Sequence, residues 1–175
     1  MKYIDTALGQ LAFAWKLYHY ALEGNIDLKR LDIPLTFQEG NQVMVMVLPD
    51  RVLDSDNDLI LALENNLVIA FGAAAITLNR CREEAGLKLV SNISSVTDEF
   101  ASVVYQIRNA FAHDIAEPRW EIRNPAYARA YNIEGIVIDL SQLHGKKFEY
   151  ADIGGPDVLF ALKYFGDRNV WHRFL

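Results

Sequence analysis

The spacing of apolar and polar residues predicts that the first two-thirds of the chain is helical. Residues 3–23 carry a wide apolar face and end before a Gly-Asn pair, which is typical of a helix C-terminus. Residues 57–84 show the strongest helical periodicity, and the middle of that segment, Leu67 to Leu78, is apolar on nearly all sides. This segment is therefore expected to be the central helix, and Gly86 is expected to end it.

The ends and the close packing of these helices also have local signals. A polar residue at 56–58 is expected to cap the central helix, because short polar side chains bond to the first turn. A glycine followed by three alanines at 72–75 permits close approach of another helix. A third helix is predicted from a cap at Ser94 or Ser95 to about His113. Its apolar stripe contains Val96, Phe100, Val103, Ile107 and Phe111.

Shorter segments predict a smaller β component. Residues 42–48 are short and β-branched, which suits a strand, an extended arm or a buried helical turn. In the last third of the chain, Tyr131–Leu140 is expected to be a strand. A turn at His144–Lys146 then leads to a returning strand over Lys147–Ala151.

The expected fold is mainly α: a helical bundle with a small C-terminal β-hairpin and short helix as an appendage. The bundle spans residues 1–117. Residues 118–175 are a mixed β/α extension that is too small to bury its own core, so it is expected to pack on the bundle rather than form a domain. Its short helix follows Gly154-Gly155-Pro156-Asp157 and is expected to be closed by Gly166.

Composition and charge limit the function more than the fold. The 175 residues suit one domain, and 51% apolar with 23% charged residues is the balance of a globular protein. The net charge of −6 argues against general binding of polyanions, so any role with nucleic acid must rest on a local site.

Membrane segments and metal sites are not expected. The longest charge-free run, residues 65–79, is shorter than the roughly 20 apolar residues that span a bilayer. The N-terminus lacks an apolar signal core. The one cysteine, Cys81, is expected to be buried and excludes a cysteine-rich zinc site. We therefore expect a cytoplasmic protein with no cofactor.

The most informative segment for chemistry is Arg108-Asn109-Ala110-Phe111-Ala112-His113-Asp114. On a helix, one polar stripe would contain Ser102, Tyr105, Asn109 and His113, beside the apolar stripe. Arg108 lies about 100° from Asn109, but its long side chain can swing toward the same groove.

These residue types suit cleavage of a phosphodiester. His113 can take or give a proton at neutral pH. Arg108 can bind phosphate oxygens with its forked guanidinium, and Asn109 can orient the imidazole or the phosphate. A ribose 2′-hydroxyl deprotonated by His113 would attack the adjacent phosphorus without a metal, giving a 2′,3′-cyclic phosphate and a 5′-hydroxyl.

A purely structural interpretation has to be weighed against this one. With ten Arg and four His in the chain, an Arg-x-x-x-x-His spacing arises by chance roughly 0.2 times. A histidine at a helix end often contacts only the last carbonyls. Arg108 would equally suit an ion pair with Asp114 or Glu117.

The same seven residues resemble the signature of the HEPN superfamily, an Arg–x(4–6)–His motif on a late helix of a small helical domain. The resemblance implies a HEPN-like bundle and a metal-independent endoribonuclease, of the kind found in toxin–antitoxin and phage-defence systems. It also implies that Arg108 and His113 are catalytic, with Asn109 in support. The alternative is a non-catalytic HEPN-like module that binds a partner protein or a nucleotide, since some members of the superfamily have no activity.

The resemblance also implies a homodimer, an RNA substrate and, for a toxin, an antitoxin partner. Tyr105, Ser102 and Arg119 are weaker candidates for substrate binding. Trp120, Tyr127 and Tyr131 can stack on bases, or can instead fix the connection to the core. The other histidines are expected to be structural (His19), exposed in a turn (His144) and part of a docked tail (His172).

Overall fold

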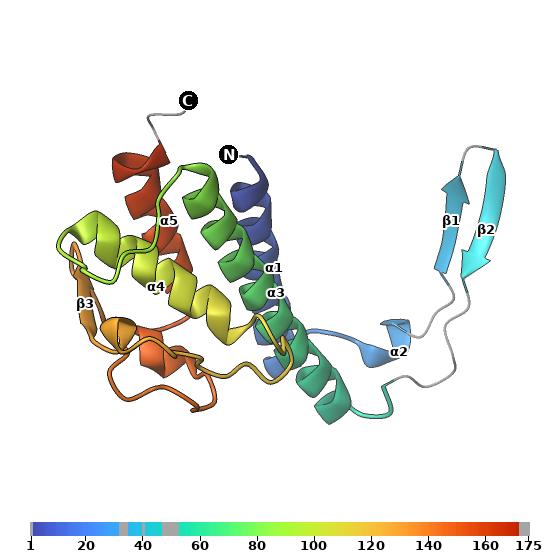
Figure 1. The fold of residues 1–175 in the computed structure, drawn as a ribbon. Coiled ribbons are helices and arrows are strands. Elements are labelled where there is room, and N and C mark those ends of the chain that lie inside the picture. The colour runs from blue at the N-terminus through green and yellow to red at the C-terminus, as the bar shows by residue number, and fades with distance from the viewer. Residues whose placement is uncertain (1, 32–34, 40, 47–52, 172–175) are drawn as a thin grey trace. The chain divides into compact units, whose positions relative to one another are not determined.

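The computed structural model describes residues 2–31, 35–39, 41–46 and 53–171, and the chain within them is mainly helical (Figure 1). It divides into two compact units. One unit comprises Met1–Ala12 and Val68–Leu175, and the other comprises Phe13–Leu67. Residues 118–171 belong to the same unit as the third predicted helix.

The unit of residues 13–67 contains the end of α1 (Lys2–Leu22), the short α2 (Leu28–Leu31) and the start of α3 (Asp56–Glu84). It also contains an antiparallel hairpin of β1 (Leu35–Glu39) and β2 (Gln42–Met46), in which Glu39 pairs with Gln42. Of the three alternatives for residues 42–48, the strand is confirmed over 42–46, and the last two positions lie outside the described residues.

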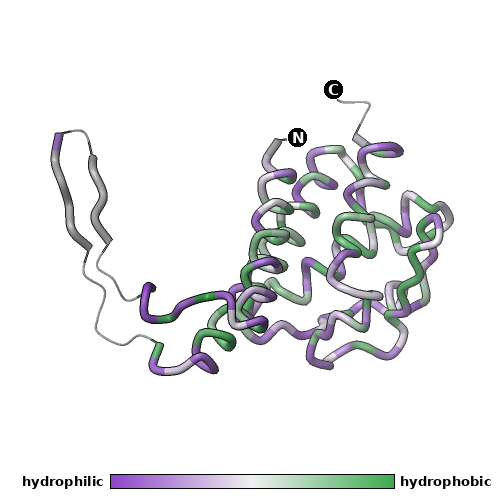
Figure 2. The backbone as a smooth tube through the Cα atoms, turned by 180° about the vertical axis from the view of Figure 1, so that it is seen from behind, coloured by the Kyte–Doolittle hydropathy of each residue, from purple (hydrophilic) through white to green (hydrophobic). Residues whose placement is uncertain are grey.

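The first two predicted helices are confirmed with small shifts. Hydrophobic and hydrophilic residues alternate along both, as they do in amphipathic helices (Figure 2). The expected cap of α3 at 56–58 is wrong, because Ser55 caps the helix. Its Oγ accepts a hydrogen bond from the Asp58 amide at 3.3 Å and donates to the Asp58 carboxylate at 2.8 Å. Gly86 follows the helix with φ +71°, as expected of a C-terminal glycine.

The larger unit buries its core between α3, α4 (Val96–Ala110) and the C-terminal segments. Phe71 of α3 is fully buried and lies within 5.5 Å, between ring centroids, of both Phe111 and Phe148. A Cβ at Gly72 would come 2.7 Å from Phe111 Cδ1. The glycine therefore permits the close approach that the sequence predicted, between α3 and the segment after α4.

Helix α4 begins as expected and ends early. Ser95 and Asp98 form a capping box, in which the Ser95 hydroxyl accepts from the Asp98 amide and the Asp98 carboxylate accepts from the Ser95 amide. The Ser95 hydrogen bond holds the pKa of the Asp98 carboxyl below its usual value. The helix ends at Ala110, so His113 lies in the turn that follows and not on the helix.

The predicted strand over residues 131–140 is wrong, because that segment is itself a hairpin. β3 (Ala130–Ile133) pairs antiparallel with β4 (Ile136–Asp139) through a two-residue turn. The turn residues Glu134 and Gly135 have φ of 49° and 95°, the left-handed conformation that such hairpin turns need. The expected returning strand at 147–151 is also wrong: Lys147 forms one isolated bridge with Arg119, and Tyr150–Ile153 is a 3-10 helix.

The final helix, α5 (Val158–Asn169), runs three residues beyond Gly166, which was expected to close it. Gly166 instead lies under the indole of Trp171, where a Cβ would come 2.0 Å from Trp171 Cζ2. The glycine is needed for close packing rather than for a helix end. His172, the expected docked tail, lies outside the described residues.

In the described part of the chain, α3 is the one helix long and apolar enough to cross a membrane by length and composition. Its most apolar 18-residue window has a mean hydropathy of 1.9. A third of that window (33%) is buried inside the fold, and the core helix of a globular protein meets the same two criteria.

Candidate functional site

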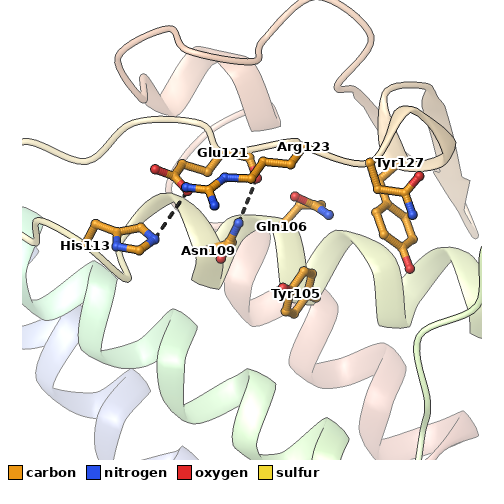
Figure 3. A pocket seen from close by; sticks show the side chains of 8 residues that line it. Tyr105, Gln106, Asn109, His113, Glu121, Arg123 and Tyr127 are labelled. Atoms are coloured by element: carbon orange, nitrogen blue, oxygen red, sulfur yellow. Dashed lines mark hydrogen bonds and ion pairs between the residues drawn. The ribbon is translucent and has the colours of Figure 1, made fainter.

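A cavity of about 210 Å³ lies between α4 and the connection that follows it (Figure 3). One side comes from α4 and the turn after it, and the other from residues 121–127 of the connection. Most of its lining residues are polar or charged: Tyr105, Gln106, Asn109, His113, Glu121, Arg123, Asn124 and Tyr127.

Side-chain hydrogen bonds hold the connection beside α4. Asn109 Nδ2 donates to the Glu121 carbonyl at 2.7 Å. The fully buried Trp120 donates its indole N–H to Asp152 Oδ2 at 2.8 Å. On the far side, Asn124 caps the short 3-10 helix Pro125–Tyr127 by accepting from the Ala126 amide at 3.0 Å. These contacts explain how an irregular segment forms a fixed cavity wall.

Three charged or titratable groups gather at one end of the cavity. Glu121 Oε2 lies 3.3 Å from His113 Nε2 and 2.9 Å from a guanidinium nitrogen of Arg123. The side chains of His113 and Arg123 are 66% and 75% exposed, whereas that of Glu121 is 29% exposed. One carboxylate therefore contacts both the His113 imidazole and the Arg123 guanidinium at an end of the cavity that solvent reaches.

A buried amide lies further along the cavity. Gln106 is 2% exposed, and its Oε1 is enclosed without a hydrogen-bond partner. Within the part of the chain that the structure describes, neither end of this amide forms a hydrogen bond. Buried polar side chains are normally paired, so Gln106 is an exception that the fold itself does not explain.

The structure brings together three of the predicted site residues and leaves out the arginine of the motif. Tyr105, Asn109 and His113 line the cavity, but Arg108 does not. Burial lowers the pKa of the Arg82 guanidinium on α3, and the nearby charge of Arg108 lowers it further. Arg108 therefore does not share the cavity lining with His113.

The two other candidates for substrate binding lie elsewhere. Ser102 is fully buried, and its hydroxyl donates to the Asp98 carbonyl at 2.8 Å. Arg119 is exposed, and its backbone pairs with Lys147. Neither residue lines the cavity. The sequence could not reveal this, because a helical stripe does not show which of its positions the following connection covers.

The purely structural interpretations concerned an ion pair of Arg108 and the packing of three aromatic residues. Arg108 forms no ion pair with any described residue, and Asp114 instead accepts backbone hydrogen bonds from Glu117 and Ala116. Those bonds hold the pKa of the exposed Asp114 carboxyl below its usual value. Trp120 and Tyr131 are fully buried, so they fix the connection to the core and cannot stack on bases. Of the three aromatic candidates, Tyr127 alone lines the cavity.

Four residues that line the cavity were not predicted: Gln106, Glu121, Arg123 and Asn124. Gln106 had a signal, because Ser102 and Asn109 of the predicted polar stripe are its i−4 and i+3 neighbours on a helix. Glu121 and Arg123 had no signal of their own, since their place depends on how the connection folds back.

The remaining candidates carry less chemistry. His144 is exposed, as expected, and its Nδ1 accepts from the Ile122 amide at 3.1 Å, which supports the connection from behind. His19 stacks on Trp15 of the same helix at 5.6 Å between ring centroids. Burial raises the pKa of the Cys81 thiol to about 11, which leaves it unreactive. Among the described residues, no three His, Cys, Asp or Glu side chains are placed to hold a metal ion.

Comparisons of the chain with protein-family models, with curated proteins and with solved structures find no match. The functional argument therefore rests on the cavity and on the resemblance of the Arg108–His113 segment.

Proposed function

We propose that the protein is a HEPN-like, metal-independent endoribonuclease whose chemistry takes place at the cavity beside α4. The observation that carries this proposal is the cluster of His113, Glu121 and Arg123 at its exposed end. It combines a group that transfers protons at neutral pH, a carboxylate that orients it, and a guanidinium that binds phosphate.

His113 is the proposed catalytic base. Its contact with Glu121 through Nε2 favours the tautomer with the proton on that nitrogen, so Nδ1 is left with a lone pair. Nδ1 takes the proton of a ribose 2′-hydroxyl, and the 2′-oxygen attacks the adjacent phosphorus. The bond from phosphorus to the 5′-oxygen breaks, and that oxygen takes up a proton at this solvent-exposed site. The products are a 2′,3′-cyclic phosphate and a 5′-hydroxyl.

Arg123 is the proposed phosphate-binding residue in place of Arg108. Its guanidinium lies on the same carboxylate as His113, whereas Arg108 lies outside the cavity. Asn109 acts as a positioning residue, because its side-chain amide donates to the Glu121 backbone carbonyl and so fixes Glu121 beside α4. A phosphate at this end would replace Glu121 as the partner of Arg123.

An RNA cleavage assay in EDTA tests the proposal. Wild-type protein is expected to cleave single-stranded RNA and to leave 2′,3′-cyclic phosphate ends, and His113→Ala is expected to abolish cleavage without loss of folding. His19→Ala is the matched control, because that imidazole is exposed, stacks on Trp15 of its own helix and lies outside the cavity lining. Equal cleavage by wild type and His113→Ala would remove His113 from the mechanism.

A second candidate function is a non-catalytic HEPN-like module that binds a nucleotide or a partner protein. It is favoured by one observation: Glu121 contacts both His113 and Arg123, so its carboxylate offsets the charge of Arg123 and occupies the imidazole. Nucleotide binding without RNA cleavage, by wild type and His113→Ala alike, would support this function instead.

The biological setting follows from the resemblance alone. We propose a homodimer that acts in the cytoplasm as a toxin or phage-defence component, with an antitoxin as a further partner. Exposed apolar side chains on the larger unit's part of α3, Ile69 and Ile76, are compatible with a dimer. Light scattering at micromolar concentration tests it, and a monomer would count against a shared active site.

A further inference from the structure

The Glu121 carboxylate lies where an oxyanion ligand of the cavity would lie. Its Oε2 is 3.3 Å from His113 Nε2 and 2.9 Å from a guanidinium nitrogen of Arg123. Figure 3 shows the three side chains together at one end of the cavity. An imidazole and a guanidinium are the kinds of group that bind phosphate oxygens, and here one oxygen of the chain itself contacts both.

This carboxylate also removes the positive charge of the cavity. With histidine neutral, Glu121 and Arg123 are the charged members of the lining set, so its formal charge is zero. Without the carboxylate the lining would carry one positive charge, in a chain whose net charge is −6. An approaching phosphate therefore meets a guanidinium whose charge is already offset.

The contact between Glu121 and Arg123 is one that a ligand can break. The Arg123 side chain is 75% exposed, and ion pairs of such exposed groups contribute little to stability. The firm contact of Glu121 is made by its backbone, because Asn109 Nδ2 donates to its carbonyl at 2.7 Å. The carboxylate can thus leave Arg123 while the connection stays beside α4.

We propose that Glu121 is an autoinhibitory group that occupies the phosphate subsite at Arg123 in the free protein. A phosphate of single-stranded RNA displaces the carboxylate from Arg123, and Glu121 keeps its contact with His113. Removal of the carboxylate should therefore strengthen phosphate binding and slow cleavage at the same time. The inference rests on the proposed function for RNA as the source of the phosphate, but competition at Arg123 does not depend on cleavage.

Titration of the whole ¹⁵N-labelled chain with inorganic phosphate at low ionic strength, followed by NMR chemical shifts, tests the competition. Glu121→Gln is expected to bind phosphate about tenfold more tightly than wild type, because a negative charge beside the ligand is lost. Adding Arg123→Gln to that variant is expected to remove the gain. Glu117→Gln is the matched control: it changes the net charge equally at an exposed position outside the cavity lining, so its affinity should stay within about twofold of wild type.

Three results would overturn autoinhibition. They are equal phosphate affinity of wild type and Glu121→Gln, a gain that survives in the double variant, and an equal gain in Glu117→Gln. Thermal unfolding confirms that each variant is folded, and Glu121→Ala provides a second substitution. A single-stranded DNA oligonucleotide, which lacks the 2′-hydroxyl and stays intact, is expected to show the same gain. A gain with inorganic phosphate alone would overturn nucleic acid as the source of the ligand.

Cleavage kinetics separate this inference from the proposed function. In Glu121→Gln, KM for RNA and kcat are both expected to fall, a combination that simple loss of structure does not produce. RNA cleavage by wild type, with equal phosphate affinity in Glu121→Gln, would overturn autoinhibition and leave the nuclease intact. Tighter phosphate binding by Glu121→Gln, without cleavage by any variant, would support autoinhibition and overturn the nuclease.

Discussion

Two buried polar side chains near α4, Arg82 and Gln106, differ in their hydrogen bonding. On the α3 side, Arg82 bonds to Asn79 Oδ1 at 2.9 Å, to Glu83 Oε1 at 3.0 Å and to the Leu87 carbonyl. On the cavity side, Gln106 is buried as deeply and bonds to none of the described residues. The three guanidinium nitrogens of Arg82 all have hydrogen-bond partners. Folding alone therefore does not explain why the Gln106 amide has none.

The difference separates polar groups that serve folding from those that serve binding. Arg82 satisfies the carbonyl that follows α3 and so helps to end the helix, which is a structural role. The unpaired Gln106 amide costs folding free energy. Unfavourable features of this kind are concentrated at functional sites, where a ligand can supply the missing partner. The contrast is therefore an argument for the cavity as a binding site that is independent of the HEPN-like motif.

The largest expected effect concerns the paired side. Arg82→Met is expected to lower the free energy of unfolding by about 3 kcal/mol, because Asn79 and the Leu87 carbonyl lose a buried charged donor. Urea denaturation measures the change. Arg80→Met is the matched control: its side chain is 70% exposed, pairs at the surface with Glu84 and lies 5.3 Å from the centroid of the Tyr3 ring, so the change should stay below about 1 kcal/mol. Equally small losses of unfolding free energy in the two variants would mean that the buried hydrogen bonds of Arg82 stabilise the fold no more than a surface ion pair does.

The next prediction tests which arginine, Arg123 or Arg108, takes part in RNA cleavage. Under the proposed function, Arg123→Gln is expected to lower the rate of RNA cleavage on the order of a hundredfold, the usual result of losing one group that stabilises developing charge. Arg108→Gln is expected to change it little, since Arg108 lies outside the cavity. Single-turnover cleavage in EDTA measures both.

The reverse ranking would favour the motif over the cavity. A large loss in Arg108→Gln with none in Arg123→Gln would mean that the active site forms on the α3 side of α4, as a face shared between two copies of the chain.

Helical periodicity predicted α1, α3 and α4, because each buries a continuous apolar stripe that local spacing reveals. The hairpin at residues 130–139 was missed because its turn uses Glu134 with positive φ, a conformation that glutamate rarely adopts. Gly166 was mistaken for a helix end because a glycine needed for a neighbouring indole looks the same in sequence as one needed for a left-handed turn.

The site was predicted only where its residues belong to one helix or the turn after it. Asn109 and His113 follow from the spacing of the motif. Glu121 and Arg123 reach the cavity because Trp120 and Asn109 fix the connection, and contacts of that kind are not encoded in local spacing. Gln106, beside Ser102 and Asn109 of the predicted polar stripe, was the overlooked local signal.

A smaller effect is expected at the start of α4, the helix that both flanks share. Asp98→Ala is expected to lower the free energy of unfolding by about 1 kcal/mol at pH 7, because the capping box is lost. The folded-state pKa of Asp98 lies below its unfolded value, so its contribution is complete above the unfolded pKa and is lost as the pH falls through the folded pKa. The difference between wild type and variant should therefore shrink in acid.

Urea denaturation of both proteins at pH 7 and in acid measures this. Asp157→Ala is the control, because Asp157 is the N-cap residue of α5 but makes no side-chain capping bond. A difference that grows as the pH falls would contradict the assignment of the cap.

The smallest expected effect is also the most direct test of the contrast. Gln106→Met is expected to leave the free energy of unfolding unchanged or to raise it by up to about 1 kcal/mol, because the variant buries an apolar group of similar volume in place of an unpaired amide. Urea denaturation without nucleotide measures it, beside the exposed Gln142→Met, for which a change within about 0.5 kcal/mol is expected. A loss above about 1 kcal/mol would mean that the amide already contributes to folding. Gln106 would then belong with Arg82, as a polar group that serves folding.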